Sequence, residues 1–303
     1  MNFVVFSLII DDIVFPDGQT AMGVLGGGGP QTAWGMAAAL GSGEQVGLVA
    51  GVGDDLSDDM LASLAGITLD GLRQTKNPTP RAWQIHEHDG RRTQVWRTPP
   101  RNLGEQLAKN FDVLPENYRN AQNFHWGIHP GDADLNFAKA LHAEGKRVSL
   151  EAFKGASQPL TESQRRELFS ACDVFSAGCD EFMPLFDNLS EDEAVIQPQK
   201  SGLKTLMIRN GADGASVYDY LNQRLIHAPA LPADVVDVTG AGNAFSGAFI
   251  ARLAEDVAEA LCHGLVTAAY MIEHMGIPPN FPDADDYQQR LDAARNSLNE
   301  TSL

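Results

Sequence analysis

The residues of this 303-residue chain best suited to phosphate chemistry lie in one short segment, from Asp237 to Phe249. A polar turn there opens directly into a row of small residues. Gly240 and Gly242 lack a Cβ atom, so their backbone can approach a ligand closely and point successive N–H groups at it. A helix that begins after the turn adds the positive end of its dipole. The segment predicts an anion site, with an ordinary helix start capped by Thr239 or Asn243 as the alternative.

A second glycine segment lies near the N-terminus. Residues 27–29 are three successive glycines, followed by Pro30, Gln31, Thr32 and an alanine-rich stretch that ends at Leu40. A glycine loop before a helix with proline in its first turn would need no ligand. Residues 49–55 then form a further glycine-containing element that ends in two aspartates.

Together these motifs resemble the ribokinase-like carbohydrate kinase family. The family's C-terminal signature is Asp-Thr-x-Gly-Ala-Gly-Asp before a small-residue helix. This chain matches the signature at Asp237, Gly240, Ala241, Gly242, Ala244, Phe245, Gly247 and Phe249. The two N-terminal segments are similar to the family's Gly-Gly-x-Pro-x-Asn loop and its Gly-x-Val-Gly-Asp-Asp element. Two distant motifs in the family's order are more specific than either one alone.

The resemblance implies a site for ATP, Mg²⁺ and a small hydroxylated substrate. Residues 240–242 would form the anion hole over the transferring γ-phosphoryl group, with Asn243 at the catalytic position. The positions that match substrate-binding residues are Asp11, Gly27, Gly28, Thr32 and Glu151. The positions that match nucleotide-binding residues are Asp237, Thr239, Arg209, Gly211, Gly214 and Ala268. Glu181 would help to hold the magnesium through water.

The chain departs from the family at the catalytic position, where Asn243 replaces an aspartate that acts as general base. A carboxamide cannot accept a proton at pH 7, but it can still orient a hydroxyl by hydrogen bonding. Phosphoryl transfer depends heavily on positioning and charge stabilisation, so this change need not abolish turnover. Thr32 replaces the substrate-binding asparagine, and Val238 replaces a threonine of the signature.

Two hypotheses about function therefore stay open. The first is an ATP-dependent phosphotransferase acting on a hydroxyl of a small sugar, nucleoside or related polyol. The second is a pseudokinase, a ligand-binding or regulatory protein that keeps the fold without efficient turnover. A nucleotide-dependent dehydrogenase is disfavoured, because no Gly-x-Gly-x-x-Gly sequence follows the first predicted strand.

Short apolar runs alternate with helical patterns along most of the chain, which predicts parallel strands joined by crossover helices. The predicted strands cover residues 4–10, 46–49, 122–126, 148–150, 174–176 and 205–208. The predicted helices cover residues 32–40, 57–64, 133–143, 162–169 and 244–254. We therefore expect one α/β domain over residues 1–303, with three layers and a mostly parallel central sheet. Beyond Asp283 the polar tail is expected to end in a frayed terminus.

A small β lid is expected from residues 12–25 and 82–97. Large residues alternate on both sides of Asp89-Gly90, a dipeptide typical of a tight hairpin turn. The interval from Asp11 to Gly27 is short for the family, which predicts a reduced lid and a wetter site. The hairpin could also supply an edge for a homodimer. His86 on this hairpin is expected to be solvated, and its arginines to be paired with carboxylates.

Composition limits the possible partners. The net charge of −18 should repel phosphate backbones, so we expect no nucleic acid partner. The apolar stretch near the N-terminus suits a buried strand, and no run is long enough to span a membrane. Three scattered cysteines fit a reducing cytoplasm. His125 and His129 are four residues apart, but Gly127 and Pro130 argue against a helical metal site there.

Overall fold

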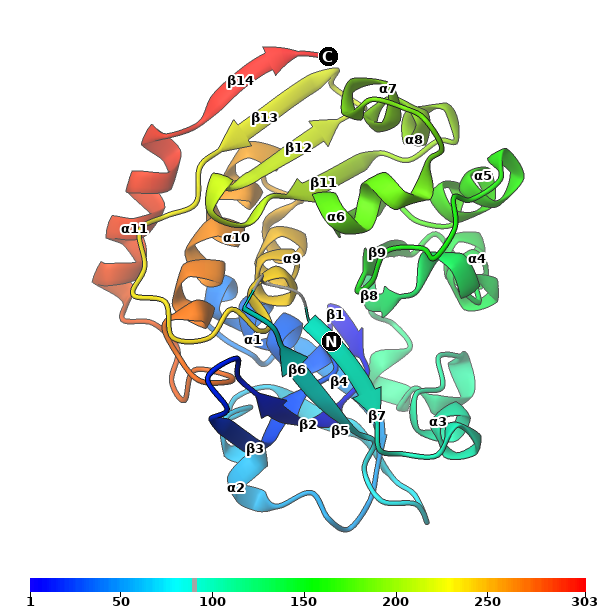
Figure 1. The fold of residues 1–303 in the computed structure, drawn as a ribbon, viewed down its shortest axis with the longest axis vertical. Helices are drawn as coiled ribbons and strands as arrows, with labels where there is room; N and C mark the ends of the chain where they lie inside the picture. The colour runs from blue at the N-terminus through cyan, green and yellow to red at the C-terminus, as the bar shows by residue number, and fades with distance from the viewer. Residues whose placement is uncertain (89–91) are drawn as a thin grey trace.

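A main β-sheet runs through the molecule, and a smaller sheet lies at one end of it, in the lower part of the view in Figure 1. The computed structural model describes residues 1–88 and 92–303. In these residues the main sheet has ten strands in the order β14-β13-β12-β11-β10-β9-β8-β1-β4-β5. Neighbouring strands from β11 to β5 are parallel, and those from β11 to β14 are antiparallel. The prediction of a mostly parallel central sheet is confirmed.

The strands form where apolar runs allow burial on both faces. The strands of the main sheet are β1 (Phe3–Phe6), β4 (Val46–Val52), β5 (Thr68–Gln74), β8 (Asn123–Ile128), β9 (Arg147–Ala152), β10 (Val174–Gly178), β11 (Thr205–Arg209), β12 (Ala215–Asp219), β13 (Arg224–Ala228) and β14 (Asn299–Ser302). All seven residues of β4 are buried, as expected for a strand covered on both sides. Strands near every predicted range are present.

Helices cover both faces of the main sheet and give the three expected layers. One face carries α1 (Gly29–Leu40), α9 (Ala241–Arg252), α10 (Val257–Ile272) and α11 (Ala284–Asn296). The remaining helices are α2 (Asp58–Ala62), α3 (Pro100–Gln106), α4 (Asn136–Ala143), α5 (Glu162–Ser170), α6 (Cys179–Phe182), α7 (Glu191–Val195) and α8 (Gln197–Lys200). Side chains of α4, α5, α6 and α7 pack on the opposite face in one large apolar cluster. No helix of the described residues is long and apolar enough to cross a membrane.

The smaller sheet, which we call the lid, has four strands in the order β3-β2-β6-β7. They are β2 (Ile9–Val14), β3 (Thr20–Gly26), β6 (Arg81–His86) and β7 (Arg92–Trp96). β6 and β7 are antiparallel, as the alternating pattern predicts. The expected Asp89-Gly90 turn between them lies outside the described residues. The interval expected to be short holds two paired strands, β2 and β3.

Two expectations were wrong. The first apolar stretch is not one strand, because Ser7 has a φ of 82° and turns the chain between β1 and β2. Asp11 therefore lies within the second strand, β2. The C-terminal tail does not fray in this structure, because α11 packs on α10 and β14 then pairs with β13. The sequence shows no apolar run at β14, whose residues are all exposed.

Candidate active site

The glycine turn before α9 begins the helix without any side-chain cap. Gly240 is the N-cap residue with a φ of 84°, a conformation that favours glycine. A Cβ atom at this position would lie 2.6 Å from Cγ of Gln31. No side chain caps the first turn of α9, so the alternative of a helix start capped by Thr239 or Asn243 is wrong. The N–H of Thr239 donates to Asp237, and that of Ala241 makes only a long bond of 3.4 Å to the carbonyl oxygen of Val238. With no side-chain cap, the helix start remains suited to an anion.

α1 begins in the same way and meets α9 at its start. Its N-cap is Gly28, with a φ of 82° and no side-chain cap. A Cβ atom on Gly28 would lie 3.0 Å from Nδ2 of Asn243, so the two glycine turns are in contact through this side chain. The helices approach so closely that a Cβ on Gly247 would lie 2.1 Å from the carbonyl oxygen of Thr32. The small-residue rows therefore bring both predicted motifs together.

Asp237 lies beside the α9 turn and is 3% exposed. Its Oδ1 accepts a hydrogen bond from the N–H of Thr239 at 2.9 Å, which shapes the turn. Its Oδ2 is buried without a hydrogen-bond partner. A buried carboxylate oxygen without a donor fits a place for a metal ion or for one of its waters.

Three further buried polar atoms without partners lie around the α1 turn and the lid. They are Oε1 of Gln31, Oγ1 of Thr32 and Oε1 of Gln84. Asp11, 4% exposed, accepts a hydrogen bond from Nε2 of Gln84 at 2.8 Å. Buried polar groups are normally paired, so unpaired ones on the elements that border the glycine turns are compatible with a polar ligand there. Gln84 was missed by the sequence analysis, although it lies on the same side of β6 as His86.

The lid reaches the α9 turn through His86. Nε2 of His86 lies 3.3 Å from Oγ1 of Thr239, within hydrogen-bond distance. The expectation that His86 is simply solvated is therefore wrong. The expectation for the lid arginines is confirmed for Arg81 and Arg97, because both bind the carboxylate of the fully buried Asp12.

Arg209, Glu151 and Glu181 form a buried network at the carboxyl ends of β11, β9 and β10. Nη1 of Arg209 donates to Oε1 of Glu151 at 2.5 Å, and Nη2 donates to Oε2 of Glu181 at 3.2 Å. Oε2 of Glu181 also accepts a hydrogen bond from the N–H of Gly178 at 2.7 Å. Burial raises the pKa of Glu181 above its ordinary value, although Arg209 opposes this effect.

For the remaining predicted residues, the structure shows backbone turns and packing contacts within the protein. Gly27 has a φ of 86°, and a Cβ there would lie 3.0 Å from the backbone nitrogen of Ile9. Gly211 begins the turn between β11 and β12, and a Cβ on Gly214 would lie 2.0 Å from the carbonyl oxygen of Ala228. Ala268 on α10 packs against the apolar cluster that includes β12 and β13. Packing thus accounts for the residue type at Gly214.

The described residues contain no cluster of three or more histidine, cysteine, aspartate or glutamate side chains suited to hold a metal ion. His125 is buried on β8, with Nδ1 3.1 Å from Oγ of Ser149, so it is a packed strand residue. A magnesium ion at this site would depend on the phosphates of a nucleotide for ligands. Asp237 and Glu181 are the side chains that fit such an ion.

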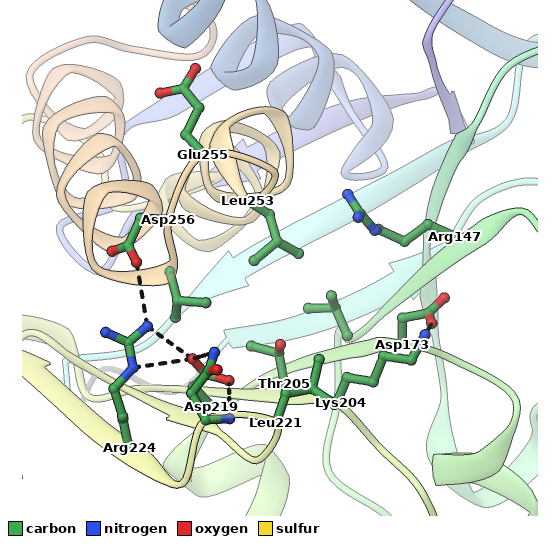
Figure 2. Close-up of a pocket in the computed structure, with 13 residues that line it drawn as sticks. Arg147, Asp173, Lys204, Thr205, Asp219, Leu221, Arg224, Leu253, Glu255 and Asp256 are labelled. Atoms are coloured by element: carbon green, nitrogen blue, oxygen red, sulfur yellow. Dashed lines mark hydrogen bonds and ion pairs between the residues drawn. The ribbon is translucent and has the colours of Figure 1, made fainter.

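A separate cavity of about 360 Å³ lies at the opposite, amino ends of β10 and β11 (Figure 2). Its charged groups pair with each other: Arg224 binds Asp219 and Asp256, and Lys204 binds Asp173. In a parallel α/β sheet, ligands bind at the carboxyl ends of the strands. The glycine turns lie at that end, so they and not this cavity form the candidate active site.

Comparisons with known proteins identify the family and the fold. Residues 2–284 match the family described as pfkB family carbohydrate kinase. A cytidine kinase of Thermococcus kodakarensis is 27% identical over 245 residues, which cover 80% of this chain and 84% of that protein. A fructokinase with bound ATP from Xylella fastidiosa superposes with a TM-score of 0.76 at 19% identity, covering 96% of this chain and 98% of that one. A ribokinase from Arabidopsis thaliana, complexed with ribose and ATP, superposes with a TM-score of 0.71 at 22% identity, with the same coverage. The solved structures confirm the predicted three-layer fold. Since the family match spans nearly the whole chain, this protein belongs to the pfkB family of carbohydrate kinases, the ribokinase-like family that its two glycine motifs resemble.

Proposed function

We propose that this protein transfers the γ-phosphoryl group of ATP to a hydroxyl of a small sugar, nucleoside or related polyol. One observation carries the proposal: the uncapped starts of α1 and α9 meet at Asn243, beside buried polar atoms that have no partner. Such a site offers N–H donors to phosphate on one side and polar side chains to hydroxyls on the other.

The nucleotide side of the site is formed by the α9 turn. The N–H groups of residues 240–242 would bind the γ-phosphate and the charge that develops as it is transferred. Mg²⁺, when bound, neutralises part of the phosphate charge. Asp237, and Glu181 through water, would hold this ion. Thr239, Gly211, Gly214 and Ala268 would border the rest of the nucleotide.

The acceptor side is formed by the α1 turn and the lid. Asp11 would accept hydrogen bonds from substrate hydroxyls, with Gly27, Gly28 and Thr32 close by. Gln84 holds Asp11 in place and presents its own Oε1 as a further acceptor. Asn243 would orient the attacking hydroxyl at the point where the two turns touch. Contact of His86 with Thr239 holds the lid near the turn and helps to exclude water.

The hairpin edge supports a second part of the proposal, that two chains pair in a homodimer. β7 is an edge strand of the lid, and Val95 and Trp96 are 45% and 40% exposed. An edge strand with exposed apolar residues favours pairing with another chain. Sedimentation equilibrium of wild type and Val95→Lys would test this pairing, because a charge at the edge should produce monomers.

The experiment for the proposed activity measures ADP release and ATP binding. Purified protein is incubated with Mg²⁺, ATP and a panel of neutral sugars and nucleosides, and calorimetry gives the dissociation constant for ATP. We expect ATP binding and turnover with at least one acceptor. Gly242→Val should weaken ATP binding strongly, because its Cβ would lie 2.5 Å from Nη1 of Arg209 and the branched side chain would displace the turn. Normal ATP binding by this variant would show that the phosphates lie elsewhere.

A further inference from the structure

The buried network of Arg209, Glu151 and Glu181 is joined directly to the α9 turn. A Cβ atom on Gly242 would lie 2.5 Å from Nη1 of Arg209 and 2.8 Å from its Cζ. The guanidinium therefore packs against a glycine of the turn itself. Nη1 also lies 3.3 Å from Oγ of Ser246, one helical turn further along α9.

The same guanidinium is fixed on its other side to the main sheet. It binds Glu151 on β9 and Glu181 on α6, and its own backbone belongs to β11. Ser246 in turn lies 2.9 Å from Oγ of Ser176 on β10. A planar guanidinium with five donors can satisfy several fixed acceptors at once, which a single ammonium group cannot do. Arg209 thus ties the first two turns of α9 to the ends of three neighbouring strands.

Charge is the second consequence of this arrangement. Burial would raise the pKa of Glu151, but Arg209 and His125 outweigh it and lower the pKa to about 2. Glu151 is therefore an ionised carboxylate, 3% exposed, near the start of α9. Removal of Arg209 would leave this charge and that of Glu181 uncompensated. The charge of Glu151, which is given no metal to hold, would then act against a nucleotide whose terminal phosphate is also negative.

Both oxygens of Glu151 face protein groups. Oε1 binds Arg209. Oε2 is buried without a hydrogen-bond partner among the described residues, but it lies within ion-pair distance, 3.5 Å, of Nε2 of His125, whose side chain is 3% exposed. The polar atoms of the lid and the α1 turn are provided by other residues, Asp11 and Gln84 among them. This geometry favours a role for Glu151 toward Arg209 over a role toward the acceptor.

We propose that Arg209 is the positioning residue of the phosphate-binding turn, and that Glu151 is its counter-ion and not a ligand of the acceptor. Arg209 fixes Gly242 and Ser246 relative to the sheet and cancels the carboxylate charge beside the turn. The inference rests on the proposed kinase function, and it assigns to Glu151 a role different from the one that the family resemblance implies.

The test compares Arg209→Met, Arg209→Lys, Glu151→Gln and the double variant Arg209→Met/Glu151→Gln with wild type. Calorimetry gives the dissociation constants for ATP and ADP, steady-state kinetics gives kcat and the KM of the acceptor, and thermal melting reports folding. Arg224→Met is the matched control, because Arg224 also binds a buried carboxylate, that of Asp219, and an exposed one, that of Asp256, but lies at the amino ends of the strands (Figure 2).

We expect Arg209→Met to lower kcat about 100-fold through two effects. The turn is displaced, and a misplacement of about 1 Å alone can lower the rate strongly, and the charge of Glu151 is left uncompensated beside the transferring phosphate. Its dissociation constant should rise at least tenfold for ATP and less than threefold for ADP, because the turn contacts the terminal phosphate. Arg209→Lys should retain the fold and show a smaller loss. Glu151→Gln should leave the acceptor KM within twofold of wild type. The double variant should recover at least tenfold of the kcat lost in Arg209→Met, since it removes the uncompensated charge.

Three results would each overturn the inference. The first is an acceptor KM raised tenfold or more in Glu151→Gln, and the second is a double variant with no recovery of kcat. The third is a change in Arg209→Met and Arg209→Lys that is confined to the melting temperature, as expected for Arg224→Met. Failure of the proposed function is a different observation. It would appear in the wild type as absence of ATP binding, or as ATP binding without turnover of any acceptor, and it would remove the inference with it. Failure of the inference alone requires a wild type that binds ATP and phosphorylates an acceptor.

Discussion

Asn243→Asp is the substitution that best separates positioning from proton transfer in this site. Asn243 is half-buried in the first turn of α9, and its Nδ2 lies against Gly28. Aspartate has nearly the shape of asparagine, so it should fit without displacing either turn. The α9 dipole stabilises a negative charge in its first turn by roughly 0.3–1 kcal/mol, which keeps the new carboxylate ionised at pH 7.

The size of the effect follows from the chemistry that asparagine lacks. A general base typically contributes about 10²–10⁴-fold in rate, equal to roughly 3–5 kcal/mol of activation free energy. Phosphoryl transfer has a loose transition state in which the nucleophile is deprotonated late, so the lower end of this range applies. We expect Asn243→Asp to raise kcat about 100-fold and to change the dissociation constant for ATP less than threefold.

The assay is ADP release at saturating ATP and Mg²⁺ over a range of pH, with Asn243→Ala as control. The aspartate variant should gain an acidic limb in its pH–rate profile that the wild type lacks. The alanine variant should be slower than wild type, because it can neither accept a proton nor orient the hydroxyl. A wild type that binds ATP and acceptor but turns over only as Asn243→Asp would establish the pseudokinase alternative.

A kcat for Asn243→Asp equal to or below that of the wild type, with normal ATP binding, would refute the reasoning. The attacking hydroxyl would then lie away from Asn243, and another group would accept its proton. The position of the acceptor at the contact between Gly28 and Asn243 would have to be abandoned.

Three further predictions concern single residues. Asp11→Ala should raise the acceptor KM about 10- to 100-fold, since hydrogen bonds to a charged group contribute roughly 1.5–3 kcal/mol. Calorimetry should show ATP binding unchanged. An unchanged KM would remove Asp11 from the acceptor site. Gly240→Ala should lower the free energy of unfolding by about 1–3 kcal/mol and weaken ATP binding in calorimetry. The backbone φ of 84° strains an alanine, and its Cβ would lie 2.6 Å from Gln31. Tight ATP binding by this variant would contradict the required shape of the turn. Burial would raise the pKa of Asp173, but hydrogen bonds to His142 and Lys204 outweigh burial and lower the pKa to about 2, below the ordinary 3.8. The ionised carboxylate therefore adds about 2 kcal/mol to the free energy of unfolding above pH 4, and this contribution is lost as the pH falls toward 2. Urea unfolding of wild type and Asp173→Asn should show that difference at pH 7 and its decrease below pH 4, and a difference independent of pH would exclude the ion pairs as its source.

The parts of the fold that sequence could predict are those encoded locally. Apolar runs with burial on both faces marked β4 and β8 through β11, and the glycine turn marked the start of α9. The break at Ser7 was missed, because a positive φ in a non-glycine residue leaves no compositional signal. β14 was missed because pairing with β13, and not burial of its side chains, holds it in the sheet.

Within the candidate active site, the sequence predicted which residues take part but not which of them contact each other. Arg209, Glu151 and Glu181 were each identified as candidates, but for three separate ligands. Their contact depends on β9, β10 and β11 being neighbours in the sheet, which is a property of strand order. Gln84 lies 73 residues from Asp11, and their hydrogen bond depends on the pairing of β2 with β6.

Backbone contact between α1 and α9 links these local and non-local features. Cβ atoms on Gly35 and Gly247 would lie 2.2 Å and 2.1 Å from carbonyl oxygens of the opposite helix, so the two backbones touch along their length. Side chains at such a contact cannot adjust by changing rotamer, because there are none between the backbones. The distance between the acceptor turn at Gly28 and the phosphate turn at Gly240 is therefore set by helix packing. In phosphoryl transfer, where positioning supplies much of the rate, the glycines between the helices are as much a part of the site as those that face the ligands.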